Sequence, residues 1–313
     1  MRPASACVPA GNFHIVIGRR AARIAVMLGA AITLAACSGG VLQPKGPVGG
    51  ANALILLDAV GIMSVIVVPT LIAVLVFAWW FRASNRRALF RPDFVYSGEI
   101  ELLVWSVPLL VILFLGGVIW VGSHELDPFR PISAEKEPLK VQVIALDWKW
   151  LFIYPDQGVA SVNELVVPSG TPVHFSITSA SVMNMFFVPQ LGSMVAAMNG
   201  MVTQLHLQAD HPGDYHGLSA QYSGDGFSGM NFTLRAVPQD DFTRWVATTR
   251  QTGPTLDRAA YAQLAQQSQD VKPYSYRAVD PGLFQAVASR EIAPAPGPSI
   301  ENAAARVRPK GGQ

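Results

Sequence analysis

Half of the 313 residues are apolar and only 14% are charged, whereas soluble domains carry roughly 25% charged residues. Part of the chain is therefore expected to lie in lipid. The net charge is +2 and no basic run is interleaved with aromatic residues, which argues against a nucleic-acid-binding protein. The length allows about two domains.

Residues 1–36 have the pattern of a signal peptide. Arginines precede an apolar stretch, residues 24–36, and this order is typical of export signals. The string Leu34-Ala35-Ala36-Cys37 then places small residues directly before a cysteine, as in the lipobox of bacterial lipoproteins. We predict cleavage after residue 36 and acylation of Cys37. The alternative is a buried cysteine in an uncleaved helix.

The second cysteine, Cys7, falls within the segment that would be removed. If Cys37 carries lipid, the mature chain has no free thiolate. Two-copper and blue-copper sites both need a cysteine ligand, so the sequence predicts that neither kind of site forms in this chain.

Two uncharged runs follow, residues 59–81 and 102–122. At 1.5 Å per residue, either run spans the roughly 30 Å hydrocarbon core of a bilayer. We therefore predict a transmembrane helical hairpin over residues 53–122, preceded by a periplasmic segment, residues 37–52.

The loop between these runs contains four arginines and one acidic residue, Asp93. Cytoplasmic loops are enriched in Lys and Arg, which places this loop in the cytoplasm and both outer ends of the hairpin in the periplasm. A lipid-modified Cys37 leads to the same orientation. Glu99 and Glu101 lie at the start of the second run, where the helix dipole favours carboxylates. The expected location is the bacterial inner membrane, in contact with the lipid bilayer.

A β-rich periplasmic domain is predicted over residues 138–237. Short alternating stretches, such as residues 141–143, 173–178 and 205–207, are separated by turns that contain Gly or Pro. Strands spaced about 8 to 12 residues apart favour a β-sandwich or a Greek-key barrel.

Several side chains of this domain invite a functional interpretation. The tryptophans of Asp147-Trp148-Lys149-Trp150 are expected to pack the domain against the hairpin. His206, His211 and His216 are five residues apart, a spacing that points strand side chains in different directions, so no metal site is predicted. Methionines between residues 183 and 201 are expected to form an apolar contact surface instead of Cu(I) ligands.

The stretch from Leu218 to Met230, LSAQYSGDGFSGM, has the frame of a copper-binding loop without its copper ligands. It resembles the C-x-x-x-C-G-x-x-H-x-x-M loop of subunit II of haem-copper respiratory oxidases. Gly224 and Met230 match that loop, whereas Ser and Phe stand in place of Cys and His. An upstream family histidine is also replaced, within SVMNMFFVP. The predicted vestigial copper positions are Asn184, Ser219, Gln221, Ser223, Phe227 and Met230.

Together with the segment FFVPQLGSMVAAMNGM, this loop resembles subunit II of the cytochrome bo-type ubiquinol oxidases over roughly residues 37–290. The resemblance implies a membrane-anchored all-β protein with a two-helix transmembrane hairpin and a cupredoxin-like Greek-key β-sandwich that holds no copper. It implies no cofactor in this chain, and haems and copper in a partner subunit I. It further implies that quinol, not cytochrome c, serves the complex, and that Glu101 lies at the entrance of a proton-uptake channel.

Residues 238–292 are expected to form a helical, aromatic-rich C-terminal extension. Phe242, Trp245 and Val246, and later Leu256 and Leu264, show helical spacing. The segment VKPYSYRAVDPGLFQAVAS resembles the aromatic-rich C-terminal motif of the same family. Residues 293–313, rich in Pro and Gly, are predicted to be disordered.

The sequence thus favours a non-catalytic subunit of a proton-pumping quinol oxidase. A copper-bearing cytochrome c oxidase subunit would require ligands that this chain lacks. The alternative from another class is a free-standing periplasm-facing lipoprotein that binds a ligand or assists oxidase assembly. The hairpin counts against this alternative, because a lipid-anchored binding protein needs no transmembrane helices.

Overall fold

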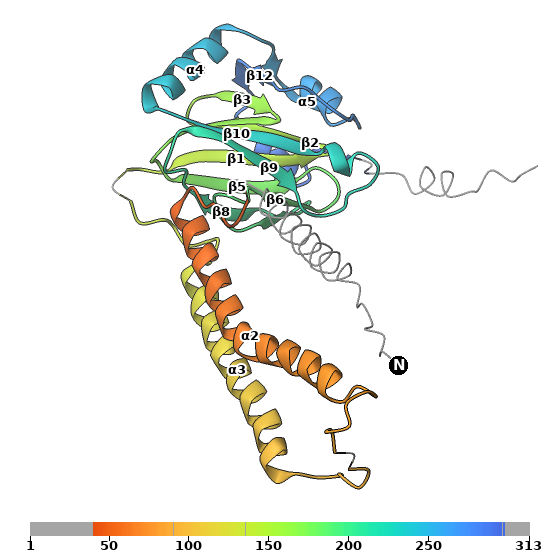
Figure 1. The fold of residues 1–313 in the computed structure, drawn as a ribbon. Coiled ribbons are helices and arrows are strands. Elements are labelled where there is room, and N and C mark those ends of the chain that lie inside the picture. The colour runs from red at the N-terminus through yellow and green to blue at the C-terminus, as the bar shows by residue number, and fades with distance from the viewer. Residues whose placement is uncertain (1–39, 90, 135, 296, 298–313) are drawn as a thin grey trace, which may run out of the picture. The chain divides into compact units, whose positions relative to one another are not determined.

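This computed structural model describes residues 40–89, 91–134, 136–295 and 297. The predicted signal peptide and Cys37 lie outside these residues. The described part begins with two long helices and continues into a β-domain and a short C-terminal extension (Figure 1).

Helices α2 (Pro47–Trp80, 34 residues) and α3 (Gly98–Glu125, 28 residues) form the hairpin. Both are long enough and apolar enough to cross a membrane. Each extends beyond the predicted apolar run because helix ends tolerate small and polar residues. Pro47 suits the first helical position, where no backbone N–H is needed, and Glu99 and Glu101 lie in the first turn of α3 as expected.

The start of α2 lies against the β-domain. The backbone N–H of Gly49 donates to the carbonyl oxygen of Leu191 at 2.9 Å. A Cβ atom added at Gly46 would lie 2.0 Å from the carbonyl oxygen of Gln208, so the chain can approach this closely only without a side chain. These contacts explain why α2 begins at Pro47, within the segment that was predicted to precede the hairpin.

The β-domain is a sandwich of two sheets. The first has the strand order β12 (Tyr274–Tyr276), β3 (Val159–Val162), β2 (Lys149–Tyr154), β1 (Leu139–Leu146), β5 (Val173–Ser179) and β8 (Thr203–Leu207). The second has the order β4 (Glu164–Pro168), β10 (Asn231–Val237), β9 (Gly213–Ser219), β6 (Asn184–Phe187) and β7 (Val195–Ala197).

The chain passes repeatedly between these sheets, and β1 pairs in parallel with β5 although most other neighbours are antiparallel. This is the expected cupredoxin-like topology, and it confirms the strands predicted at residues 141–143, 173–178 and 205–207.

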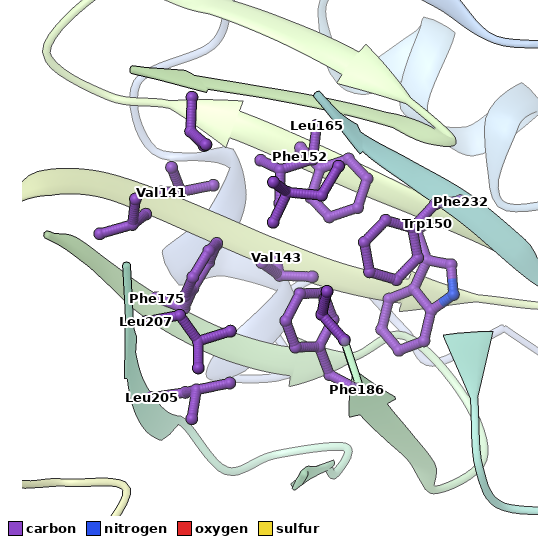
Figure 2. Packing of buried hydrophobic residues seen from close by; sticks show 14 of the residues in the cluster. Val141, Val143, Trp150, Phe152, Leu165, Phe175, Phe186, Leu205, Leu207 and Phe232 are labelled. Atoms are coloured by element: carbon purple, nitrogen blue, oxygen red, sulfur yellow. The ribbon is translucent and has the colours of Figure 1, made fainter. Parts of the chain in front are cut away.

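Aromatic side chains from both sheets fill the space between them (Figure 2). The ring of Phe186 lies 5.4 Å from Trp150 and 5.1 Å from Phe232, centroid to centroid. Trp150 is fully buried in this cluster. The prediction that Trp150 packs against the hairpin is therefore wrong, because alternation along β2 points its side chain into the sandwich.

The C-terminal extension begins with α4 (Gln239–Gln251), whose Phe242 and Val246 join the core of the sandwich. Its later elements are β11 (Thr255–Leu256), α5 (Arg258–Leu264), β13 (Ala278–Val279) and α6 (Leu283–Ala288), which cover the other face of the first sheet. A second apolar cluster joins Ile144 and Leu151 of the sheet to Tyr261 and Leu283 of the extension. Leu256, predicted to be helical, instead lies in β11 and pairs with Val279.

The predicted disordered tail, residues 293–313, is described only at residues 293–295 and 297. Within that part, the backbone N–H of Ala295 donates to the carbonyl oxygen of Ala180 at 2.9 Å.

Candidate functional site

The loop between β9 and β10 contains most of the predicted copper positions. Leu218 of β9 pairs with Asn231 of β10, and the backbone N–H of Ser219 donates to the carbonyl oxygen of Met230 at 3.2 Å. A short 3₁₀ helix, η1 (Phe227–Gly229), turns the chain back. The sheet therefore holds both ends of the loop side by side.

The structure brings four of the six predicted positions into a buried cluster. Asn184 lies on β6, and Phe186 of β6 pairs with Ser219 of β9. The Ser219 hydroxyl donates to the Asn184 amide oxygen at 3.1 Å, and the Ser223 hydroxyl lies 4.0 Å from the Met230 sulfur. These four residues are between 1% and 6% exposed. We call Asn184, Ser219, Ser223 and Met230 the buried polar cluster.

The other two positions have their side chains elsewhere. Gln221 is exposed, and only its carbonyl oxygen contacts the cluster, 3.4 Å from the Ser219 hydroxyl. Phe227 is half-buried, and its ring lies edge-on to Tyr222 with centroids 5.6 Å apart.

The chemistry of the buried polar cluster does not fit a copper site. Its side chains offer an amide, two hydroxyls and one thioether, whereas such sites need thiolate and imidazole ligands. The amide oxygen of Asn184 already accepts from Ser219, and its Nδ2 donates to the Val182 carbonyl at 3.2 Å. Among the residues described, no group of three or more His, Cys, Asp or Glu side chains could hold a metal ion.

Trp148 presses against the backbone of the same loop. Because Leu146 pairs with Lys149, Asp147 and Trp148 form a two-residue turn in which Trp148 has φ 64°. Bulky residues rarely adopt this left-handed conformation, which costs of order 1–3 kcal/mol. The Trp148 indole N–H donates to the Ser223 carbonyl at 3.0 Å. Trp148 therefore packs on the loop, and the prediction that it packs on the hairpin is wrong.

The other side of this turn is tied to the C-terminal extension. Lys149 is 1% exposed, and its ammonium donates to the Gln266 carbonyl and the Ser268 hydroxyl, both at 2.7 Å. Burial lowers the pKa of Lys149 to about 8, opposed by the charge of Asp147. Asp147 in turn accepts a hydrogen bond from Ser181. The extension thus holds the turn from which Trp148 reaches the loop.

A histidine pair near the hairpin was not expected from the sequence. His174 of β5 and His206 of β8 are direct cross-strand partners, and their rings stack with centroids 4.6 Å apart. Burial and then the neighbouring His206 lower the pKa of His174. His206 Nδ1 lies 3.1 Å from the Pro128 carbonyl oxygen, so His206 connects the segment after α3 to the β-domain.

The remaining predicted site residue, Glu101, lies in the first turn of α3 with an exposed side chain. Almost none of the apolar window of either hairpin helix is buried within this chain. In the β-domain, Met183, Met194 and Met201 are exposed as well.

Two family models match parts of this chain. The family model described as cytochrome c oxidase subunit II, periplasmic domain, matches residues 157–237, and the COX aromatic rich motif matches residues 250–290. The periplasmic domain of subunit II of cytochrome oxidase from Bradyrhizobium japonicum aligns with 38% of this chain and 98% of its own, at 25% identity and a TM-score of 0.36.

Relatives of known sequence match over most of the chain. It is 48% identical over 266 residues to ubiquinol oxidase subunit 2 of Acetobacter aceti, covering 84% of this chain and 86% of that protein. It is 45% identical over 259 residues to cytochrome bo(3) ubiquinol oxidase subunit 2 of Pseudomonas putida, covering 83% and 82%. The chain therefore belongs to the ubiquinol oxidase subunit 2 family of the haem-copper oxidases.

Proposed function

We propose that this chain is the non-catalytic subunit II of a proton-pumping ubiquinol:oxygen oxidoreductase, and that it packs on and stabilises a haem-bearing subunit I. The observation that carries the proposal is the buried polar cluster. Neutral side chains fill the place where relatives with a copper loop would present thiolates and imidazoles, and the Asn184 amide is paired with the Ser219 hydroxyl and with the Val182 carbonyl.

A subunit without copper suits an enzyme that receives electrons from quinol. Ubiquinol is dissolved in the membrane, so its electrons need no metal centre that faces a soluble cytochrome c. In this proposal the haems and the copper belong to subunit I, and this chain has no cofactor.

The hairpin supports the packing on subunit I. Its apolar helix surfaces are exposed within this chain, and lipid or neighbouring helices must cover them. The exposed methionines of the β-domain supply an adaptable apolar surface of the kind that suits a protein contact.

The proposed place of the chain is the inner membrane, with the β-domain in the periplasm and Cys37 carrying a lipid anchor. Cys37→Ser should abolish the mass increase that acylation adds to the mature N-terminus. A mature chain of unchanged mass in that variant would contradict the lipidation of Cys37.

Glu101 is proposed to lie at the entrance of a proton-uptake path. Its exposed carboxylate in the first turn of α3 can exchange protons with water and with a neighbouring subunit. Glu101→Gln should slow proton uptake during reoxidation of the reduced complex. The control is Glu99→Gln, which removes a carboxylate from the same turn, and equal effects of both variants would contradict the assignment.

The test of the whole proposal is purification through a tag on the C-terminal end of the chain, followed by haem spectra and copper analysis. We expect haem-containing partner subunits to copurify, with one copper per complex. A tagged chain that is purified alone and without haem would favour the free-standing lipoprotein instead.

A further inference from the structure

The hairpin loop joins α2 to α3 at the ends of both helices that are remote from the β-domain. α2 contacts the β-domain at its start, through Gly49 and Leu191, and α3 leads back into β1 at its end. The loop, residues 81–97, therefore lies at the opposite membrane surface. Its described residues are 81–89 and 91–97.

One arginine of the loop is used to end the first helix. The Arg82 guanidinium lies 4.9 Å from the centre of the Trp79 ring. It also donates to the Trp79 carbonyl and to the Ser84 hydroxyl, both at 3.0 Å. Arg82 thus caps α2, and its hydrogen-bonding groups are directed at the helix end.

The other three arginines have no such use. Arg86, Arg87 and Arg91 are exposed, and within the described residues none of them forms an ion pair. The loop's one acidic residue is Asp93. Within the loop the arginines therefore outnumber the one acidic residue, and Glu99 and Glu101 follow only in the first turn of α3.

Apolar side chains of the same loop are unusually exposed. Leu89 is 75% exposed, Val95 is 90% and Tyr96 is 71%. A loop in water has no reason to expose such residues together. At the boundary between headgroups and acyl chains, however, aliphatic side chains and tyrosine are favoured.

We propose that Arg86, Arg87 and Arg91 form a binding site for anionic phospholipid headgroups, with Leu89, Val95 and Tyr96 inserted beside them into the membrane surface. A guanidinium can donate two parallel hydrogen bonds to a phosphate. Basic segments directly beside a transmembrane helix are attracted to anionic lipids, by an amount equivalent to roughly fivefold in affinity per basic side chain.

A membrane occupant explains both features of the loop, whereas a protein partner explains them only in part. An acidic protein surface would neutralise the three arginines but would not need the apolar side chains at the level where the helices leave the bilayer. A lipid headgroup and its acyl chain supply a negative charge and an apolar surface at the same depth.

The experiment uses the whole oxidase complex, delipidated in detergent, with dioctanoyl-phosphatidylglycerol as the probe and native mass spectrometry as the readout. The variant is Arg86→Gln/Arg87→Gln/Arg91→Gln. The matched control removes the same charge from arginines of the β-domain side: Arg130→Gln/Arg244→Gln/Arg277→Gln. The number of lipids bound to the unmodified complex is compared with the number bound to the variant, and the difference gives the lipid held at this loop.

We expect the affinity of the complex for phosphatidylglycerol at this loop to fall on the order of a hundredfold in the variant. The control should bind the lipid as the unmodified complex does. Equal binding by the variant and the unmodified complex would overturn the proposal. So would loss of a partner protein with unchanged lipid binding, because the loop would then be a protein contact.

If the variant complex does not assemble, two further measurements test whether the loop binds anionic lipid. The Arg→Lys triple keeps the charge and should bind phosphatidylglycerol. In the unmodified complex, the preference for phosphatidylglycerol over phosphatidylcholine should shrink as salt screens the charges. A preference that is unchanged between low and high salt would contradict a site built on arginines.

Discussion

The hydrogen bond between Ser219 and Asn184 links β9 to β6, and its contribution to the free energy of unfolding can be measured. In Ser219→Ala, the Asn184 amide oxygen stays buried without its donor. Asn184 is 1% exposed, so water cannot replace that donor without a structural change. A buried polar group that loses its partner costs about 1–3 kcal/mol.

A loss of about 2 kcal/mol lowers the melting temperature by roughly 4–8 °C in a domain of this size. The assay is thermal unfolding of the chain in detergent, followed by near-ultraviolet circular dichroism of the β-domain. Ser228→Ala is the control, because this serine of the same loop is exposed, and its truncation should change stability by no more than about 0.5 kcal/mol.

The double variant Asn184→Ala/Ser219→Ala makes the test specific. With both side chains removed, no unpaired amide oxygen remains from this hydrogen bond. The double variant should therefore lose clearly less free energy of unfolding than the two single variants lose together. Strictly additive costs would refute the view that these two side chains stabilise the loop through their mutual hydrogen bond.

Three further predictions concern the same domain. Phe186→Ala should lower the free energy of unfolding by about 3–5 kcal/mol, because the ring is fully buried between Trp150 and Phe232. Phe129→Ala, at an exposed phenylalanine, is the control in the same unfolding assay. Similar losses in both variants would contradict the placement of Phe186 in the core. The pKa of Lys149 is about 8 in the folded chain and 10.5 as its ordinary value, so the unfolded state binds more protons between these values and stability should rise with pH in that window. Lys149→Met should flatten this rise in denaturant unfolding at pH 8 and 10, and an unchanged slope would contradict the burial of a charged amine. The combined variant Asn184→His/Ser219→Cys/Ser223→Cys/Phe227→His introduces thiolates and imidazoles at the predicted copper positions. It should bind copper with strong visible absorption. A variant that takes up no copper would show that these positions are not a former copper site.

The hairpin and the β-domain were predictable because their signals are local. Uncharged runs long enough to span a bilayer indicated α2 and α3, and alternation within a few residues indicated β1, β5 and β8. The helix ends were less certain from sequence, because α2 begins where Gly46 can approach Gln208, a contact between residues far apart in the chain.

Side-chain partners across the fold could not be predicted. Trp148 was assigned to the hairpin, but the tight turn after β1 places it on the loop through Ser223. The His174 and His206 pair depends on the register between β5 and β8, which no local pattern specifies. The covering of the first sheet by the C-terminal extension did have a local signal. The run from Trp150 to Tyr154 is apolar on both faces, and the extension covers its second face.

The electron donor of the purified complex tests the central claim most directly. Oxygen uptake is measured with ubiquinol and with reduced cytochrome c on the same preparation, beside its copper content. We expect uptake with ubiquinol alone and one copper per complex, because the side chains of the buried polar cluster do not suit copper. Uptake driven by cytochrome c, with additional copper bound to this chain, would contradict the account.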